Sequence, residues 1–263
     1  MDYLLVCTVA LLAAGLTLIS GFGLGTLLMP AFAVFFPPEV AIGATAVAHL
    51  ANSLFKLALI GRWADRALIL AFGLPAIAGA VLGAALLAGV ATLPAIATYT
   101  LGPIDARITP VALAIGTLII AFAFLESSER FAAITVPKRA MPWGGLLSGF
   151  FGGLSGHQGA LRSIFLVKSG TDPKRFAGTS ATIAAMVDIA RLAIYAAGAA
   201  FFTKDLAPAA GVPWPLVAAA CLAAFAGSAL GAQLVRKVTM HHVRRTVAVL
   251  LAILGTAMIA GVI

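Results

Sequence analysis

Long hydrophobic stretches dominate the chain, and short polar connections separate them. The stretches cover approximately residues 3–36, 39–60, 67–90, 108–125, 141–168, 173–200, 213–235 and 243–262. A helix needs about 20 predominantly apolar residues to cross the hydrocarbon core of a bilayer. Most of the stretches fit a single crossing of this kind. The pattern therefore predicts an all-α integral membrane protein.

Glycines interrupt two of these stretches. Residues 3–36 would form a helix about 51 Å long at 1.5 Å per residue, against a hydrocarbon core of about 30 Å. This stretch contains the break Ser20–Gly25, so we predict two shorter helices over about 3–19 and 26–36. Residues 141–168 divide in the same way around the break at 152–159. A matched pair of broken segments in two halves indicates the binding site of a secondary transporter, because non-helical backbone is tolerated in a membrane only inside protein or beside a water-filled cavity.

The two halves of the chain resemble each other. Residues 76–84 match residues 224–232 at six of nine positions, and an offset of 135 pairs Lys56 with Arg191. Helix packing alone would explain the small-residue spacing, but not the wider correspondence. We therefore predict two repeats, residues 1–135 and 136–263, each a broken helical hairpin followed by three transmembrane helices.

The positive charges of the connections discriminate between two topologies. If each broken segment enters and leaves the membrane on one side, twelve Lys and Arg residues lie on one side and only Arg107 and Lys204 on the other. If both segments cross fully, the counts are eight and six. Cytoplasmic loops are rich in Lys and Arg, so the first distribution favours re-entrant hairpins, inverted repeats and both termini outside the cytoplasm. The twelve residues are Arg62, Arg66, Arg130, Lys138, Arg139, Lys168, Lys174, Arg175, Arg236, Lys237, Arg244 and Arg245.

Composition agrees with a membrane protein and narrows the function. The chain is 62% hydrophobic and 10% charged, whereas soluble domains carry about 25% charged residues. Its net charge of +8 resides mostly in the connections, where it orients the protein and contacts lipid headgroups; we expect no nucleic-acid binding. His241 and His242 have no Cys or acidic partner nearby, so we expect no metal and no cofactor. No catalytic set can be assigned, and we expect no enzyme.

Arg162 is the most informative of three basic residues inside apolar stretches. A charge at membrane depth costs at least a few kcal/mol and usually faces a cavity or a partner. The planar guanidinium suits carboxylate, sulfonate or phosphate oxygens, and the half-helix that begins near His157 would direct its N–H groups at an anion. We predict that Arg162 contacts an anionic substrate; pairing with a neighbour or snorkelling to the cytoplasm is the alternative.

The other two basic residues are Lys56 and Arg191, each nearer a helix end than its centre. Either could line the anion path or snorkel. Asp188 lies three residues before Arg191, so the two would form a neutral pair on one helix face. The alternative for Asp188 is proton uptake during transport.

His49 lies near the middle of its stretch, with Asn52 and Lys56 on the same helix face. Histidine titrates near neutral pH, so His49 is a candidate for coupling proton movement to the anion; a core histidine bonded to a backbone carbonyl is the alternative. His157 and Gln158 offer donors at the second break or merely shape a turn. The whole predicted substrate site comprises Ser20, Gly21, Gly23, Gly25, Thr26, His49, Asn52, Lys56, Ser155, Gly156, His157, Gln158, Arg162, Ser180 and Arg191.

Three segments carry a resemblance to a known family. They are Gly21–Gly25 followed by Pro30, the helix with Gly43-Ala-Thr45, and Gly149–Gly156. Over nearly its whole length the chain resembles the sulfite exporter TauE/SafE family, also called the 4-toluene sulfonate uptake permease family. The resemblance implies a duplicated eight-helix permease of the bacterial inner membrane with a sulfur-containing or other organic anion as substrate. In that membrane, the termini that the charge count puts outside the cytoplasm are expected to be periplasmic. Many relatives have a second glycine cluster after the break, where this chain has His157–Arg162, so its selectivity is expected to differ.

The combined expectation is a secondary transporter that moves a small sulfur-containing anion, such as sulfite or an organosulfonate, by alternating access. An anion channel, a carrier of another organic anion, a membrane enzyme and an assembly subunit are the alternatives. The expected partners are the anion and membrane lipid, and the small-residue faces would permit a homodimer. Direction of transport and coupling ion stay open at this point.

Overall fold

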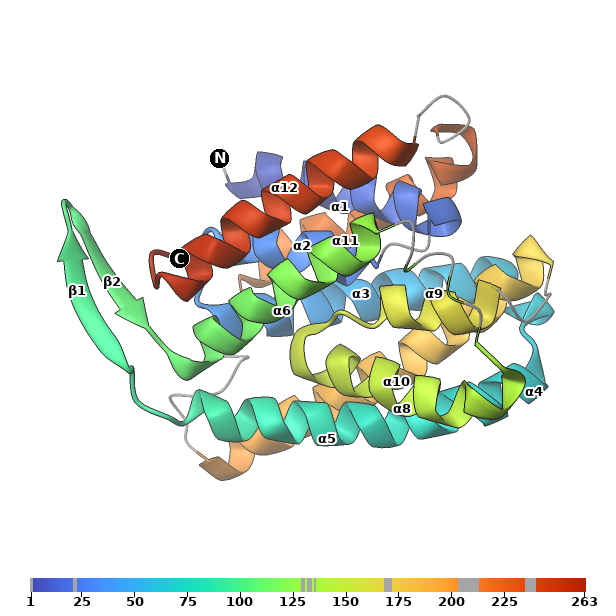
Figure 1. Cartoon of the computed structure of the whole chain (residues 1–263). Helices are drawn as coiled ribbons and strands as arrows, with labels where there is room; N and C mark the ends of the chain where they lie inside the picture. Colours follow the sequence, from blue (N-terminus) through green and yellow to red (C-terminus); the bar gives the residue numbers. More distant parts are fainter. Residues whose placement is uncertain are drawn as a thin grey trace.

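The structure, a computed structural model, describes residues 2–20, 23–128, 131, 134, 136–167, 172–202, 213–234 and 240–263. It is a bundle of helices with one small β-hairpin (Figure 1), which confirms the all-α class. The long elements are α1 (Asp2–Ser20), α2 (Leu24–Ala33), α3 (Pro38–Ile60), α5 (Leu74–Ala91), α6 (Pro110–Ser127), α8 (Met141–Ser155), α9 (Gly159–Val167), α10 (Pro173–Phe202), α11 (Trp214–Leu234) and α12 (Met240–Ile259). The short elements are the 3-10 helices η1 (Gly61–Trp63) and η3 (Lys138–Ala140), α4 (Arg66–Leu68), the π-helix η2 (Ile69–Gly73), and strands β1 (Ala97–Leu101) and β2 (Ile104–Ile108).

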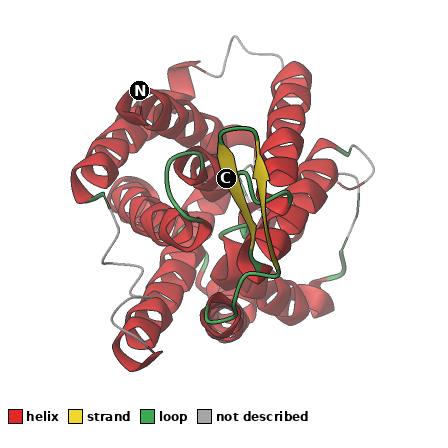
Figure 2. Ribbon diagram, turned by 90° about the vertical axis from the view of Figure 1, so that its left-hand side faces the viewer, coloured by secondary structure: helices red, strands yellow, loops and turns green. Residues whose placement is uncertain are grey.

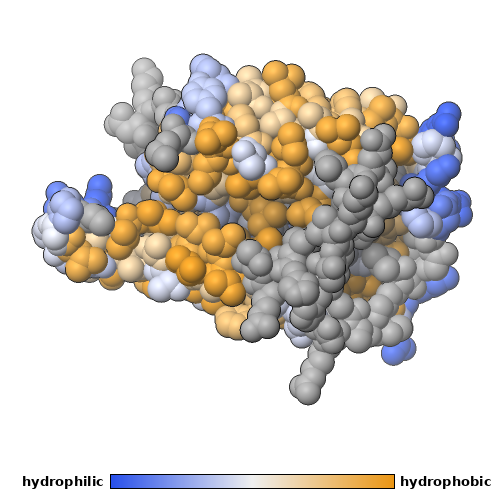
Figure 3. All heavy atoms as spheres, turned by 90° about the horizontal axis from the view of Figure 1, so that it is seen from above, coloured by the Kyte–Doolittle hydropathy of each residue, from blue (hydrophilic) through white to orange (hydrophobic). Residues whose placement is uncertain are grey.

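Several of these helices have the length and apolar character of membrane spans. Within the described residues, four are long and apolar enough to cross: Pro38–Trp63, Arg66–Ala91, Pro173–Ala197 and Trp214–Gly231. Shorter apolar helices cover Asp2–Leu16, Leu24–Ala33, Pro110–Leu125 and Val247–Ile259. Figure 3 shows a predominantly hydrophobic middle with hydrophilic residues gathered at the two ends. The structure thus has the surface of a multi-pass membrane protein.

The chain reverses direction at both predicted breaks (Figure 1). α1 ends at Ser20 and α2 begins at Leu24, while α8 ends at Ser155 and α9 begins at Gly159. The second piece of the first stretch starts two residues earlier than predicted and ends at Ala33, where the chain turns. Gly156 has φ 83°, a left-handed conformation that glycine adopts without steric cost, and its N–H caps α8 by donating to the Gly152 carbonyl.

The two hairpins open toward opposite ends of the molecule (Figure 1). α1 and α2 open toward the end that holds both termini, and α8 and α9 open toward the other end. Helix packing is reciprocal between the halves: α5 packs against α8, α11 against α1, α3 against α10, and α6 against α12. This is the arrangement expected for two inverted halves, although the repeat relationship itself stays a prediction.

Glycines bring the reciprocal helix pairs close together. A Cβ added to Gly149 of α8 would collide with the Ala76 carbonyl of α5, and one added to Gly227 of α11 would collide with the Leu11 carbonyl of α1. Backbones approach this closely only where no side chain intervenes, as in small-residue packing of membrane helices. The matched 76–84 and 224–232 segments therefore serve helix packing.

A β-hairpin that the sequence pattern did not predict follows α5. β1 and β2 pair antiparallel, and the turn contains Gly102 at φ 61°. The hairpin is tied to the C-terminus: the Tyr99 hydroxyl donates to the Ala260 carbonyl at 2.6 Å, and the Arg107 amide donates to the Gly261 carbonyl at 2.8 Å. Figure 2 shows the hairpin at the end that carries both termini.

Basic residues gather at the opposite end. Figure 3 shows a strongly hydrophilic surface there, at the end where α3 finishes and α8 and α10 begin (Figure 1). The described basic residues of these connections are Arg62, Arg66, Lys138, Arg139, Lys174 and Arg175. Arg130, Lys168, Lys204, Arg236 and Lys237, which also entered the charge count, lie outside the described residues. Within the described part, the charge asymmetry agrees with the predicted topology.

Candidate functional site

The two breaks lie against each other. A Cβ on Gly25 would stand 2.9 Å from the carbonyl oxygen of Gly156, and one on Gly23 would stand 3.6 Å from the backbone nitrogen of Gly159. The helices α2 and α9 therefore begin side by side, although they belong to different halves of the chain. The sequence predicted a site between these two breaks, and a pocket lies beside them.

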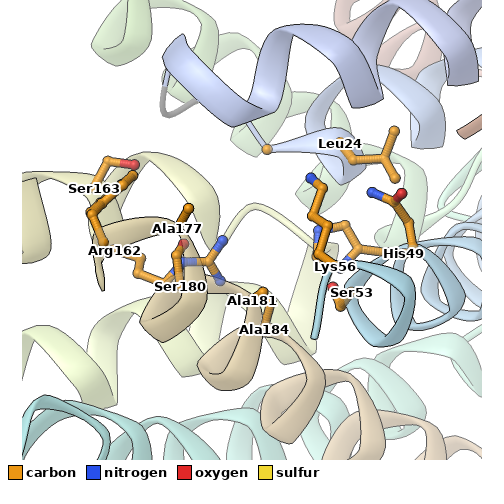
Figure 4. A pocket seen from close by; sticks show the side chains of 13 residues that line it. Leu24, His49, Ser53, Lys56, Arg162, Ser163, Ala177, Ser180, Ala181 and Ala184 are labelled. Atoms are coloured by element: carbon orange, nitrogen blue, oxygen red, sulfur yellow. The ribbon is translucent and has the colours of Figure 1, made fainter. Parts of the chain in front are cut away.

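Four helices, α2, α3, α9 and α10, contribute residues to this pocket (Figure 4). It is lined by Gly23, Leu24, His49, Asn52, Ser53, Lys56, Arg162, Ser163, Phe176, Ala177, Ser180, Ala181 and Ala184. Two of these side chains are basic, and none of the described lining residues is acidic. The pocket therefore has the charge character of an anion site.

Arg162 and Lys56 project into the pocket from facing walls (Figure 4). Arg162, on α9, is 7% exposed, and its Nη1 donates to the Oε1 of Gln158 at 2.9 Å. Its Nε has no partner among the described residues. A buried donor without a partner costs free energy. A bound anion would accept the hydrogen bond that the Nε of Arg162 does not make to the described residues. The predicted alternative in which Arg162 snorkels to the surface is wrong.

Apart from Phe176, the described residues of the α10 wall have small side chains. Ala177, Ser180, Ala181 and Ala184 recur at positions that lie on one helix face, and all four line the pocket. Alanine and serine leave room between this helix and the two basic side chains. Ser180 adds a hydroxyl, as the sequence predicted.

A buried carboxylate lies next to the pocket. Asp188 of α10 is fully buried, and its Oδ2 lies 2.5 Å from the Nδ1 of His49. Its Oδ1 accepts a hydrogen bond from the Nε2 of Gln158 at 3.2 Å and lies 2.8 Å from the Nη2 of Arg191. The predicted Asp188–Arg191 pair is therefore confirmed. The alternative in which His49 bonds a backbone carbonyl is wrong, because its imidazole faces a carboxylate 139 residues away.

Arg191 does not line the pocket; its side chain caps the C-terminal end of α8. Its Nη1 donates to the Gly152 carbonyl at 3.1 Å, and the Tyr195 hydroxyl donates to the Gly153 carbonyl. Both groups satisfy carbonyls at a helix C-terminus, where a positive charge is also favoured. Arg191 is fully buried, so it does not snorkel. The structure thus assigns Arg191 contacts that support the second break.

A family model described as sulfite exporter TauE/SafE matches residues 6–258. The chain belongs to the sulfite exporter TauE/SafE family. This is a family of membrane transporters, so the function of the chain is membrane transport. A comparison with curated proteins finds no match to the chain.

In this TauE/SafE protein, the remaining residues of the second break face inward. The Nδ1 of His157 lies 3.0 Å from the Oγ of Ser155, and its ring stacks on Phe122 of α6 with centroids 5.2 Å apart. His157 is fully buried, and its Nε2 has no partner among the described residues. Ser155 also donates to the Phe151 carbonyl at 3.1 Å. Neither His157 nor Ser155 lines the pocket.

The first break contributes less polar chemistry to the site. Gly23 lines the pocket, while Gly25 and Thr26 are buried beside it. The side chain of Ser20 and the whole of Gly21 lie outside the described residues. On the neighbouring α3, the Asn52 Oδ1 accepts from the Ser228 hydroxyl at 2.7 Å.

Sequence reasoning missed several residues of this TauE/SafE site. They are Leu24, Ser53, Ser163, Phe176, Ala177, Ala181 and Ala184 in the pocket wall. Outside the site, it also missed the hydrogen bonds that Tyr195 and Ser148 donate to backbone carbonyls around the break. The helical spacing of small residues before Asp188 could have indicated the α10 wall. Tyr195 follows Arg191 by four residues, so it shares a helix face with a predicted residue. Among the described residues, no cluster of three or more His, Cys, Asp or Glu has metal-site geometry.

Proposed function

We propose that this chain is a secondary transporter of a small sulfur-containing anion, such as sulfite or an organosulfonate, which binds in the pocket beside the two breaks. The observation that carries the proposal is the pair of facing cations, Arg162 and Lys56, in a pocket without an acidic lining residue among those described. Membership in the sulfite exporter TauE/SafE family supports the same substrate class.

The pocket offers the interactions that a sulfite or sulfonate group requires. A guanidinium donates two parallel hydrogen bonds to two oxygens of an oxyanion, and an ammonium adds a compact point charge. Ser180 adds a hydroxyl donor within the same lining, whereas the Ser163 hydroxyl already donates to the Gly159 carbonyl at 2.8 Å. The dipole of α9, which begins at Gly159 three residues before Arg162, favours an anion near this end of the helix. Together these groups replace the hydration that the anion loses on entry.

The arrangement of the hairpins supports an alternating-access cycle. The hairpins open toward opposite ends, and their breaks touch at Gly25 and Gly156 beside the pocket. Rocking of one half against the other would expose the same pocket first to one side and then to the other. The basic end would face the cytoplasm of a bacterial inner membrane, which places both termini in the periplasm.

Flux of labelled sulfite into proteoliposomes tests the proposal. Arg162→Ala removes charge-assisted hydrogen bonds worth about 1.5–3 kcal/mol, so we expect the apparent affinity to fall about 10- to 100-fold. Arg175→Ala is the matched control, because that side chain is 57% exposed at the basic end of the molecule. Normal flux in the Arg162 variant would refute the assigned site.

Saturation and exchange distinguish a carrier from an anion channel. A carrier shows saturable flux and accelerated exchange of labelled against unlabelled sulfite. A channel shows conductance driven by the membrane potential and no such exchange. If wild-type protein moves a carboxylate but no sulfur oxyanion, the site is that of another organic anion.

A further inference from the structure

Gln158 lies between the pocket cation and the buried carboxylate. Its Oε1 accepts a hydrogen bond from the Nη1 of Arg162 at 2.9 Å, and its Nε2 donates to the Oδ1 of Asp188 at 3.2 Å. The side chain is 1% exposed. One amide thus connects a residue that lines the pocket to a residue that does not, and we call this arrangement the amide bridge.

The chemistry of the partners fixes the orientation of the amide. A guanidinium only donates hydrogen bonds, and an ionised carboxylate only accepts them. A flipped amide would place its NH2 against Arg162 and its oxygen against Asp188, which would lose both bonds. The backbone at this point is held separately, because the Ser148 hydroxyl and the Arg162 amide donate to the Gln158 carbonyl at 3.0 Å and 3.1 Å. The side chain therefore responds to its two charged partners from a fixed position.

The amide bridge ends at a pair of titratable residues that reaches the pocket. Asp188 pairs with His49, and His49 itself lines the pocket. The charged groups around the imidazole are Asp188 and Arg191 from α10 and Arg162 from α9. Lys56 lies seven residues after His49 on α3 and also lines the pocket.

The other elements that pack on α3 contribute little charge near His49. Helix α2 contains no titratable residue, and α11 contains only Cys221. Helix α6 contributes Glu126 near its far end, whose side chain is outside the described part, and η1 contributes Arg62 at the basic end. Among the described residues, the charges near His49 are therefore Asp188, Arg191, Arg162 and Lys56, and the amide bridge connects two of them, Arg162 and Asp188.

We propose that Gln158 couples anion occupancy at Arg162 to protonation of His49, so that one proton travels with the anion. The proposal rests on the proposed transport function. An anion competes with the Gln158 Oε1 for the Arg162 donors, which frees the amide to move. When the Gln158 donor leaves Asp188, the carboxylate holds the His49 Nδ1 proton more strongly. The remaining ring nitrogen of His49 then takes a proton from a hydronium ion that enters the pocket from the more acidic side, which leaves a neutral water, and the imidazolium balances the negative charge of the anion.

Gln158→Leu removes both bonds of the bridge at similar side-chain volume. Ser148→Ala is the matched control, because it removes the hydrogen bond to the Gln158 carbonyl and leaves the bridge intact. In proteoliposomes we would measure sulfite accumulation under an imposed pH gradient over a range of external pH, and sulfite exchange at equal pH on both sides. We expect Gln158→Leu to keep the rate of sulfite exchange within about threefold of wild type. We expect the same variant to reduce the pH-driven accumulation of sulfite by at least about tenfold.

The ratio of pH-driven accumulation to exchange decides whether Gln158 couples the proton to the anion or only supports the structure. Wild-type pH-driven accumulation in Gln158→Leu would overturn the proposal. An equal loss of exchange and accumulation in Gln158→Leu and in Ser148→Ala would also overturn it, because a merely structural role predicts that result. A selective loss of accumulation in Gln158→Leu, with a normal ratio in Ser148→Ala, is the expected result.

A second measurement separates this proposal from the transport proposal. In ¹⁵N-histidine spectra of the protein in nanodiscs, the His49 signal is assigned with the His49→Gln variant. We expect the pH dependence of this signal to differ between wild type and Gln158→Leu, and to be unchanged in Ser148→Ala. An unmoved His49 signal would overturn the amide bridge whether or not sulfite is carried. A moved signal in a protein that carries no sulfite would support the bridge and refute the proposed substrate.

Discussion

The two breaks serve the same geometric purpose with different chemistry. The first, before α2, is followed by ten residues without a charge, and among the described residues from Gly23 to Ala33 its one polar side chain is Thr26. The second brings His157, Gln158 and Arg162 within two turns of one another. The comparison teaches that the two hairpins form a common scaffold, while the second break carries the polar and charged side chains that the first break lacks.

The residues at matched positions on α3 and α10 show the opposite division, because here the first half supplies the polar side chains that line the pocket. With an offset of 135, Ser53 corresponds to Asp188, His49 to Ala184, and Lys56 to Arg191. His49, Ser53, Lys56 and Ala184 line the pocket, whereas Asp188 and Arg191 form a buried pair behind it. Substitutions at the matched positions should therefore have different consequences.

The largest effect is expected for Asp188→Ala compared with Ser53→Ala. Removing the carboxylate leaves Arg191 buried without its ion-pair partner, which costs about 3–5 kcal/mol of folding stability. Ser53→Ala removes one hydroxyl from the pocket wall and should change the stability by less than about 1 kcal/mol. Thermal unfolding in detergent measures both. Equal unfolding temperatures for the two variants would contradict the division of roles between the matched positions.

The next comparison is between Arg191→Ala and Lys56→Ala. Arg191→Ala removes the partner of the α8 carbonyl and of Asp188, so we expect a loss of stability of about 3–5 kcal/mol. Lys56→Ala removes a pocket charge, so we expect a rise of about tenfold in the sulfite concentration at half-maximal flux, with a smaller change in unfolding temperature. Flux titrations and thermal unfolding of the same preparations test both statements. A weakened anion affinity in the folded Arg191 variant and a normal affinity in the Lys56 variant would reverse the roles.

The contact between the breaks gives a smaller effect. A Cβ at Gly25 would lie 2.9 Å from the Gly156 carbonyl oxygen, whereas one at Gly23 would lie 3.6 Å from its nearest backbone neighbour. We expect Gly25→Ala to cost about 1–3 kcal/mol through overpacking, and Gly23→Ala to cost less. Thermal unfolding and sulfite exchange of the two variants provide the measurement. If Gly23→Ala is the more harmful change, the hairpins do not meet at Gly25 as the structure shows.

The helices and the breaks were predictable because their signals are local. The length of an apolar run fixes whether it can cross the membrane, and a glycine such as Gly156, which adopts a positive φ, marks where a helix can end. The β-hairpin was not predicted because Ala97–Leu101 and Ile104–Ile108 are short strands in the connection between two hydrophobic stretches, and the length of those stretches gives no information about the connection. Thr98, Tyr99 and Thr100, which favour strands, were the available signal.

The pairing within the site was only partly predictable. Asp188 and Arg191 are three residues apart on one helix, so their contact follows from helical periodicity. The contact between His49 and Asp188 depends on how α3 packs against α10, and no periodicity within either helix specifies that partner. The two bonds of Gln158 depend in addition on the path of the chain between α8 and α9. Such contacts are determined by tertiary packing, which a single sequence does not display.

The smallest effect on stability is expected from the hydrogen bond that caps the C-terminal end of α8. The Tyr195 hydroxyl donates to the Gly153 carbonyl in the interior, and the Tyr99 hydroxyl donates to the Ala260 carbonyl at the exposed hairpin. Tyr195→Phe leaves a buried carbonyl without this donor, so we expect a loss of about 1–2 kcal/mol, whereas Tyr99→Phe should cost about 0.5 kcal/mol or less because water replaces its hydroxyl. Thermal unfolding of the two variants compares one deleted oxygen atom in two environments. Because the Tyr195 bond supports the end of α8 directly before the second break, sulfite exchange should also fall in Tyr195→Phe and stay normal in Tyr99→Phe. An unchanged exchange rate in Tyr195→Phe would mean that Arg191 alone suffices to hold the break in its transport-competent form.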